Sequence, residues 1–273
     1  MKKGVMWMML TALCCSVAGL LIRFMNAPGI VLTTFGSLIA IPVSLAIYRH
    51  PVKFTRMVIF TGIVQYLMSL SFTYANQLTT VANALVLQYT SGIFVLLLQS
   101  IETKRLPAMY KIYVMMIVLA GTAIFFADGL GTGQLMGNML GLLSGALLGL
   151  AFYLTAKPEI DAYSVGIMSF VVATIQGMTV LRAIPAIDSQ SWLAIIAYAV
   201  IVYAISGIAY SIGIKKIDAF LADLICMLEV VLAPLWVFLL FGETISMLSL
   251  VGAVMIIGGI VYMMVMDMKE ERA

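Results

Sequence analysis

Two carboxylates and a proline lie inside the apolar stretch that runs from Asp218 to Glu243 and reads DAFLADLICMLEVVLAPLWVFLLFGE. A helix of about 20 apolar residues crosses the hydrocarbon core of a membrane, which is roughly 30 Å thick. The stretch therefore predicts a transmembrane helix from about residue 219 to residue 241, with Asp223 near its start and Glu229 nearer the midplane. An ionised carboxylate at that depth costs at least ~2.5 kcal/mol, so such a side chain normally faces a protein interior or a water-filled cavity.

Glu229 is the first candidate for chemistry, because the protonation of a buried carboxylate responds to a nearby cation. It can bind the ammonium group of a substrate or carry a coupling proton; the alternative is a protonated side chain that bonds to a neighbouring helix. Asp223 is the second candidate, or else it faces cytoplasmic water near Lys215 and Lys216. The two carboxylates are about 120° apart around a helix, so we expect them on different faces.

Polar side chains in other apolar segments form a second group of candidates. Gln88 and Tyr89 lie at a depth that matches Glu229 and could offer an amide and a phenol to a polar substrate. Four further side chains are weaker candidates of the same kind: Gln65, Tyr66, Tyr153 and Tyr203. Aromatic rings at this depth can form a cage around an amine; the alternative is that these groups only bond to neighbouring helices.

The elements that must position these side chains are membrane helices. Apolar residues make up 63% of the 273 residues and charged residues 10%, with a mean hydropathy of +1.13, whereas a soluble domain carries roughly 25% charged residues. This composition predicts an all-α integral membrane protein and gives no support for a nucleic-acid partner. Apolar windows between breaks of charge, proline and glycine predict ten transmembrane helices, at residues 4–22, 29–48, 57–75, 79–100, 107–127, 136–156, 163–183, 192–212, 219–241 and 244–266.

The basic residues predict the orientation of these helices. If the N-terminus lies inside, the inner segments hold thirteen of the 15 lysines and arginines, and the outer segments hold only Arg23 and Arg182. We therefore expect a multi-pass protein of the plasma membrane, here a bacterial inner membrane, with both termini in the cytoplasm. The three cysteines all lie in apolar segments and His50 is the one histidine, so we expect no metal site and no cofactor.

The chain divides near its middle into two parts, residues 1–130 and 131–273, with five predicted helices in each. When the fourth and ninth helices are aligned, Gln88 falls opposite Glu229, and Gly92 falls opposite Pro234 within one residue. Because five is an odd number, the second copy must enter the membrane from the opposite side, as in the inverted repeats of many transporters. We expect two inverted five-helix repeats that form one membrane domain.

Proline and glycine are expected to shape the helices near the candidate site. Pro234 has no amide hydrogen and leaves the carbonyl of Val230 without its helical partner, so the helix should bend or open there. In the sixth helix, four glycines recur at four-residue intervals and share one face: Gly137, Gly141, Gly145 and Gly149. Such a face lets another backbone approach closely; the alternative is a smooth wall along which a substrate or a moving helix slides.

Two segments carry a resemblance to a known family: LQYTSGIFVLLLQSIE at residues 87–102 and LEVVLAPLWVFLLFGE at residues 228–243. They resemble the EamA-type ten-span exporters of the drug/metabolite transporter superfamily, whose pattern has prolines where Gly92 and Val230 stand here. The resemblance implies a bundle in which helices one to four and six to nine surround a central cavity, with five and ten at the periphery. It also implies movement of small metabolites, often amino acids or related polar compounds and commonly outward, by alternating access.

These features predict a secondary transporter that exports a small polar metabolite, such as an amino acid or an amine. An importer of a cationic metabolite is the alternative. An intramembrane enzyme is a remote one, because Asp218 and Asp223 lie on one helix without a Gly-x-Gly-Asp signature, and the chain has no His-Glu-x-x-His motif. The expected partners are a small-molecule substrate and the lipid bilayer; a coupling proton or other ion and a homodimer stay open.

Overall fold

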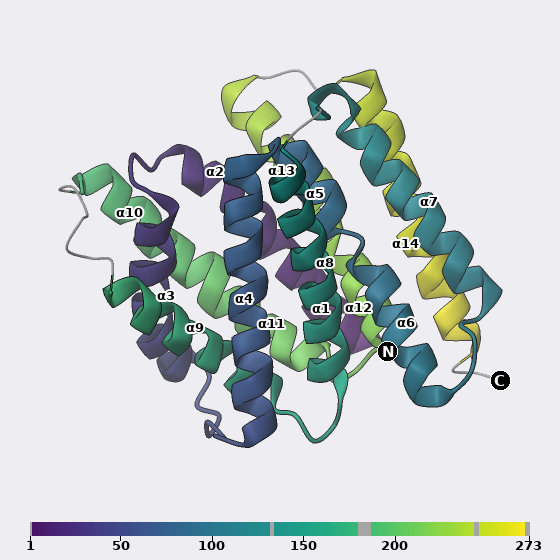
Figure 1. The fold of residues 1–273 in the computed structure, drawn as a ribbon, viewed down its shortest axis with the longest axis horizontal. Coiled ribbons are helices and arrows are strands. Elements are labelled where there is room, and N and C mark those ends of the chain that lie inside the picture. Colours follow the sequence, from purple (N-terminus) through teal and green to yellow (C-terminus); the bar gives the residue numbers. More distant parts are fainter. Residues whose placement is uncertain (1, 132–133, 180–186, 243–245, 271–273) are drawn as a thin grey trace.

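Helices make up nearly all of this computed structural model, which describes residues 2–131, 134–179, 187–242 and 246–270 (Figure 1). The first half of the chain forms α1 (Lys2–Ser16), α2 (Ala18–Arg23), α3 (Gly29–Ile47), α4 (Arg56–Leu78), α5 (Val81–Gln88), α6 (Ser91–Thr103), α7 (Met109–Phe125) and the short η1 (Ala127–Gly129). The second half forms α8 (Leu135–Ala156), α9 (Ala162–Met178), α10 (Ser189–Tyr198), η3 (Ala199–Ile205), α11 (Ser206–Gly213), α12 (Ala219–Cys226), α13 (Leu228–Phe241) and α14 (Met247–Glu270).

These helices form the ten predicted membrane spans. Several spans consist of consecutive helices: α1 with α2, α5 with α6, α10 with η3 and α11, and α12 with α13. Within the described residues, eight spans are long and apolar enough to cross a membrane, and α7 and α9 are shorter apolar helices. The all-α fold class is confirmed, and the described residues contain no strand. Arg182, Glu243 and Arg272 lie outside the described residues.

Polar caps set the ends of several helices. Five side chains accept hydrogen bonds from backbone amides in the first turn of α4, α5, α9, α10 and α12, respectively: Thr55, Thr80, Asp161, Asp188 and Asp218. Such caps satisfy amides that have no partner within the helix. Gly242 ends α13 in the left-handed conformation, with φ at 69°, which favours glycine at a helix C-terminus.

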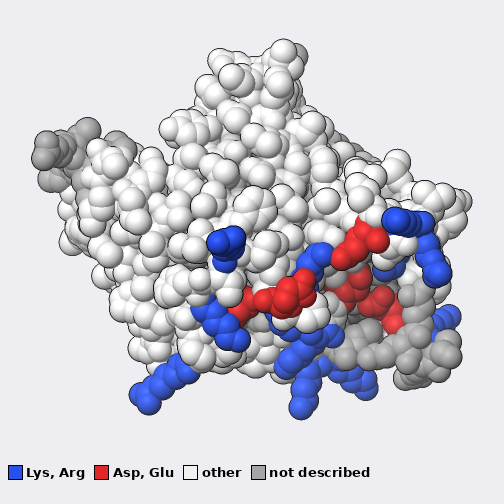
Figure 2. Space-filling model, turned by 60° about the horizontal axis from the view of Figure 1, so that its bottom comes forward, with Lys and Arg blue, Asp and Glu red and all other residues white. Residues whose placement is uncertain are grey.

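The two halves enter the membrane from opposite sides. Figure 1 shows the N-terminus and the C-terminus on the same face, and α1 begins there, whereas α8 begins on the opposite face. Lysine and arginine side chains gather around the face that carries the termini (Figure 2). We call it the basic face. The five spans of the second half are therefore inverted relative to the first five, as the odd number of spans predicted.

Spans four and nine are both interrupted near their middle. Between α5 and α6, the amide of Thr90 donates to the carbonyl of Leu87 at 3.2 Å; between α12 and α13, the amide of Val230 donates to the carbonyl of Met227 at 3.1 Å. These contacts join residues three apart, so each turn is tightened locally. The ninth span thus departs from regular helix at Met227, and α13 continues through Pro234. The sequence had placed the opening beside Pro234 and gave no sign of the one at Met227.

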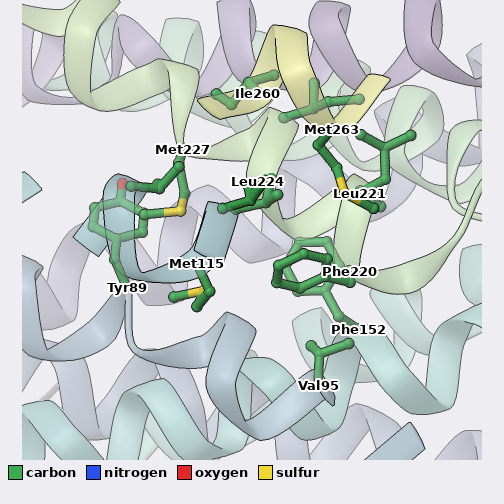
Figure 3. Close-up of a cluster of buried hydrophobic side chains, with 14 of the residues drawn as sticks. Tyr89, Val95, Met115, Phe152, Phe220, Leu221, Leu224, Met227, Ile260 and Met263 are labelled. Atoms are coloured by element: carbon green, nitrogen blue, oxygen red, sulfur yellow. The ribbon is translucent and has the colours of Figure 1, made fainter. Parts of the chain in front are cut away.

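The largest apolar core surrounds α12 on the basic side of the interruptions. Every residue from Ala219 to Ile225 is buried, and the core includes Val95 of α6, Met115 of α7, Phe152 of α8 and Ile260 of α14. Figure 3 shows Phe220, Leu221 and Leu224 of α12 among these side chains. We call this cluster the apolar floor. It packs α12 against α6 and α8 and against α7 and α14 at one side of the bundle.

The glycines of α8 pack against span four. A Cβ atom on Gly141 would lie 3.2 Å from the Leu87 side chain, and one on Gly149 would lie 2.5 Å from the carbonyl oxygen of Ser91. A Cβ atom on Gly145 would lie 2.6 Å and 2.8 Å from the carbonyl oxygens of Leu87 and Gln88. The glycine face therefore brings α8 against the backbone of the interrupted span.

The contact at Gly145 gives a first prediction. Gly145→Ala should lower the free energy of unfolding by about 1–3 kcal/mol, because the added methyl group meets backbone that cannot rotate away. Thermal unfolding in detergent measures the change. Gly258→Ala is the matched control, since a Cβ atom there meets nothing within 4 Å. Equal melting temperatures for the two variants would contradict this account of the α8 contact.

Candidate functional site

A cavity of about 560 Å³ lies between the two halves of the chain. Its lining comes from α1, α3, α4 and α5 of the first half and from α8, α9, η3, α11, α12 and α13 of the second. No lining residue comes from α7 or α14, which pack against each other at one side of the bundle (Figure 1). The cavity is thus surrounded by spans one to four and six to nine, as the family resemblance implied.

The cavity extends along most of α9, from its first turn near the basic face toward the face opposite the termini. At that end it is lined by Gly29 at the start of α3, Gln77 near the end of α4 and Gln176 near the end of α9. Gln77 is exposed, and Tyr74 beside it is 49% exposed. At the other end the cavity reaches Ala162 and Gly166 at the start of α9, and neither of these residues is exposed. This structure is therefore open toward the face opposite the termini and closed toward the basic face.

Glu229 faces the cavity and bonds to the other half of the chain. The hydroxyl of Tyr89 donates a hydrogen bond to Oε1 of Glu229. Tyr89 is 3% exposed and lies at the interruption of span four, while Glu229 lies in the first turn of α13, just beyond the interruption of span nine. Because both side chains line the cavity, a substrate that enters it meets this pair.

Asp223 forms a second pair of the same kind. The hydroxyl of Ser91 donates to Oδ1 of Asp223 at 2.8 Å, again from the first half to the second. Asp223 is only 2% exposed. The alternative that it faces cytoplasmic water near Lys215 and Lys216 is therefore wrong, because its side chain is buried between the two halves and bonds to Ser91.

Of the other residues that the sequence predicts for the site, all but one line the cavity. Gln65, Tyr66, Gln88 and Tyr203 line the cavity. Gln88 contacts Sδ of Met68 at 3.5 Å, and the hydroxyl of Tyr66 is buried without a hydrogen-bond partner in the described part of the chain.

Tyr153 is not among the residues that line the cavity. It lies at the end of α8 near the basic face, where Nζ of Lys157 is 4.6 Å from the centre of its ring. The sequence predicts the depth of Tyr153 in the membrane only approximately. In the structure Tyr153 lies in the last turn of α8, between the cavity and the charged end of the bundle. We therefore remove Tyr153 from the candidate site.

Two small polar residues also line the cavity. Cys15 and Ser206 line the cavity, and their side-chain atoms Sγ and Oγ are 3.2 Å apart. Ser91 is a further site residue that the sequence did not predict. It follows Tyr89 by two residues and bonds to Asp223. Single small polar residues in apolar segments are too common to indicate a site, so no sequence signal separated these from ordinary helix packing.

The side chains that line the cavity include acids but no bases. Asp223 and Glu229 carry the only carboxyl groups among the described lining residues, and no lysine, arginine or histidine of the described chain lines it. No group of three or more His, Cys, Asp or Glu side chains among the described residues could hold a metal ion. The lining therefore favours a bound cation over an anion, and it offers tyrosine rings and glutamine amides beside the carboxylates.

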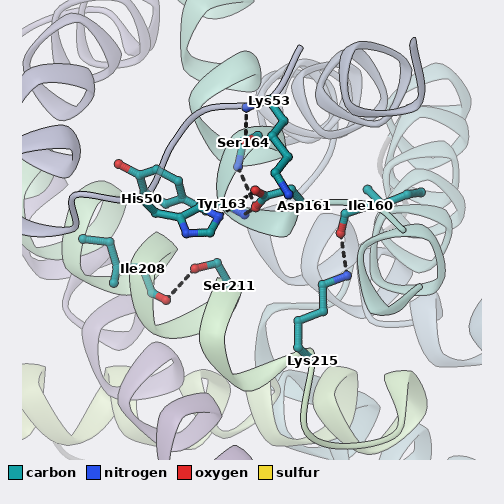
Figure 4. A network of polar contacts seen from close by, with 9 residues as sticks. All are labelled: His50, Lys53, Ile160, Asp161, Tyr163, Ser164, Ile208, Ser211 and Lys215. Atoms are coloured by element: carbon teal, nitrogen blue, oxygen red, sulfur yellow. Dashed lines mark hydrogen bonds and ion pairs between the residues drawn. The ribbon is translucent and has the colours of Figure 1, made fainter. Parts of the chain in front are cut away.

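A polar network closes the bundle below the cavity on the basic face (Figure 4). Nε2 of His50 lies 2.8 Å from Oδ2 of Asp161, and the amide of Lys53 donates to Oγ of Ser164 at 2.9 Å. The rings of Tyr48 and Tyr163 pack on that of His50, with centroids 5.5 Å and 5.8 Å away. The Tyr48–His50 contact lies within the loop between α3 and α4, and the other contacts join this loop to the start of α9, so the network links the two halves.

The Asp161 carboxylate holds its charge within this network. Burial opposes that charge, but hydrogen bonds from His50 and from the amides of Ser164 and Tyr163 outweigh it, and the pKa of Asp161 is lower than its ordinary value. A lowered pKa means that the ionised form stabilises the folded structure. This contribution is present at neutral pH and is lost as the pH falls through the lowered pKa.

Comparisons with known proteins agree with this architecture. The EamA-like transporter family matches the chain twice, at residues 2–127 and 135–265. One crystal structure superimposes with a TM-score of 0.86 over 99% of each chain at 18% sequence identity, which shows a shared fold. No curated protein matches the chain. Because the two matches together span most of the sequence, this multi-pass membrane protein belongs to the EamA-like transporter family.

Proposed function

We propose that the protein is a secondary transporter of a small polar metabolite that carries a protonated amino group, such as an amino acid or an amine. The observation that carries the proposal is the acidic cavity between the two inverted halves. Its volume of about 560 Å³ lies within the range of roughly 300–1,000 Å³ typical of small-molecule sites. Carriers built from inverted repeats bind their substrates at such an interface near the midplane.

The lining supports a cationic group on the substrate. Glu229 offers a carboxylate, and Tyr66, Tyr74 and Tyr203 offer aromatic rings that attract an ammonium group. Glutamine side chains at positions 65, 88 and 176 can bond to the polar remainder of the molecule. A metabolite whose only charge is negative finds no basic side chain among the described lining residues, so its desolvation is not offset.

The mechanism we propose is alternating access. In the state described here, the cavity is open toward the face opposite the termini, while the apolar floor and the network around His50 and Asp161 close the basic face. The positive-inside bias supports a cytoplasmic basic face in a bacterial inner membrane, which makes this the outward-open state. In the other state the contacts around Asp161 must separate while the outer mouth closes.

Export is the direction that the family resemblance favours. An exporter loads its substrate from the cytoplasm and releases it in the outward-open state. The Tyr89 hydroxyl already occupies Oε1 of Glu229 in this state, and it can take the place of a departing ammonium group. Uptake of a cationic metabolite would run through the same cavity in reverse, and an oriented transport assay separates the two directions.

The proposed substrate class is tested by ligand binding to the purified protein. A thermal-shift panel should contain the amino acids, putrescine and phenethylamine, with phenylacetate as an anion of matched size. We expect compounds with an ammonium group to raise the melting temperature and phenylacetate to leave it unchanged. Proteoliposomes should then show saturable flux of the stabilising compounds. Stabilisation by phenylacetate alone, or flux that rises linearly without saturation, would overturn the proposal.

Glu229→Gln is expected to abolish transport or uncouple it from a pH gradient while the protein stays folded. The amide oxygen can still accept the bond from Tyr89, but glutamine neither carries a negative charge nor exchanges a proton. Flux in proteoliposomes at several pH values measures the effect. Glu102→Gln is the control, because Glu102 pairs with Lys157 at 2.6 Å on the basic face, away from the cavity. Wild-type flux with an unchanged pH profile in Glu229→Gln would remove Glu229 from the mechanism.

Cross-linking tests whether the basic face must open. We expect a disulfide formed by an oxidising reagent between Lys53→Cys and Ser164→Cys, whose backbone amide and side chain are in contact, to stop transport, because it ties together the two segments that hold the network. Transport by the untreated double variant should continue. The single-cysteine variants, given the same reagent, control for reaction at the native cysteines. Full transport by the cross-linked protein would show that the basic face does not take part in the cycle.

A further inference from the structure

Asp223 is a buried acid that the proposed substrate contacts do not use. Its Oδ1 accepts one hydrogen bond, from Ser91 at 2.8 Å. Its Oδ2 is fully buried and has no hydrogen-bond partner in the described part of the chain. Oδ2 lies against Gly92, where a Cβ atom would be 3.0 Å away. Half of this carboxyl group is therefore unsatisfied, although it lines the inner end of the cavity.

The surroundings of Asp223 offer no compensating charge. Two other titratable groups face it, the hydroxyl of Tyr210 from α11 and the thiol of Cys226 from α12 itself. The Tyr210 hydroxyl is within 2.6 Å of Oγ1 of Thr155, so it already has a partner. No charged side chain of the described residues in α1, α6, α8, α13 or α14 interacts with Asp223. An isolated buried carboxylate is costly and normally takes up a proton instead.

The geometry separates Asp223 from Glu229. Asp223 precedes the interruption at Met227 and bonds to Ser91, whereas Glu229 follows it and bonds to Tyr89. Tyr89 and Ser91 in turn lie on either side of Thr90, where span four is interrupted. Each acid thus depends on a different donor from the opposite half. A movement of span four against span nine changes both pairs.

The available ligands favour a proton over a metal cation. Hard cations such as Ca²⁺ are held by about six or more oxygen ligands. Among the described residues, the one hydrogen bond to the Asp223 carboxyl group comes from the Ser91 hydroxyl, and Sδ of Met115 lies beside it against Gly92. This set cannot replace a hydration shell. A proton needs only one oxygen atom, and Oδ2 is available.

We propose that Asp223 is a proton-binding site, distinct from Glu229, and that it carries the coupling proton of the transport cycle. The coupling role rests on the proposed function; the proton site does not. A hydronium ion in the cavity transfers its proton to Oδ2, leaving water and the neutral carboxylic acid, and the reverse step releases the proton. Whether Asp223 holds the proton depends on the contact between spans four and nine, because Ser91 is the one donor to the carboxylate among the described residues.

Infrared spectroscopy of the purified protein tests the proton site without a substrate. A protonated carboxyl group gives a C=O stretching band that shifts in D₂O. We expect Asp223→Asn to remove one such band from the wild-type spectrum, whereas Glu229→Gln and Glu102→Gln leave that band in place. Ser91→Ala keeps the acid and should move the position and the pH midpoint of the Asp223 band. A spectrum that neither Asp223→Asn nor Ser91→Ala changes would overturn the site.

The coupling role is tested by the same band in the cross-linked protein. With Lys53→Cys and Ser164→Cys joined, the basic face cannot open, so the pH midpoint of the Asp223 band should differ from that of the untreated variant, which samples both states. An identical midpoint would overturn the coupling role. This outcome is distinct from a failure of the proposed transport, because a band that Asp223→Asn removes establishes the proton site whether or not any compound is carried.

Discussion

A carboxyl group inside a membrane must find its hydrogen-bond donors within the protein, and in this fold the donors come from the opposite half of the chain. Tyr89 serves Glu229 and Ser91 serves Asp223. Both pairs join the interrupted middle of span four to that of span nine. Because these two spans occupy matching places in the inverted repeats, the polar centre of the protein lies where the two halves meet. The cavity and its charge follow from this arrangement.

The contacts around spans four and nine are of two kinds. Some are close packing of apolar side chains and backbone, and others are polar contacts that can separate. The glycines of α8 bring this helix against the backbone of span four, and α12 is enclosed by the apolar floor. By contrast, the contacts around His50 and Asp161 are polar and join a loop to a helix start. Polar contacts near water separate at a small net cost, since water replaces the partners. Movement that opens the basic face is therefore expected between α9 and the loop before α4.

Much of the fold could be predicted from the sequence, because hydropathy and basic residues report on the bilayer directly. All ten spans and their inverted order follow from these two signals. The site was predicted less well. Aligning the repeats placed Gln88 opposite Glu229, but the residue that bonds to Glu229 is Tyr89. One position along a helix turns a side chain by about 100°, so a register inferred from spacing cannot decide which of two neighbours faces a partner.

Other misses have related causes. Pro234 predicted a missing hydrogen bond in the ninth span. The helical hydrogen bonds instead tighten at Met227, between the two acids, and no residue type in the sequence predicts this position. Tyr153 had the right chemistry but the wrong depth, and Ser91 had the right position but an ordinary residue type. Depth and rotation are set by how helices pack, and this information is spread over residues far apart in the sequence.

The most direct test of the account is a double-mutant cycle between Tyr89→Phe and Glu229→Leu, with the free energy of unfolding measured by SDS titration in mixed micelles. Both changes remove a polar group and keep most of the side-chain volume. If the two residues bond across the halves, the double variant should lose about 1–3 kcal/mol less than the sum of the single losses. Losses that add within about 0.5 kcal/mol would contradict the pairing at the centre of the protein.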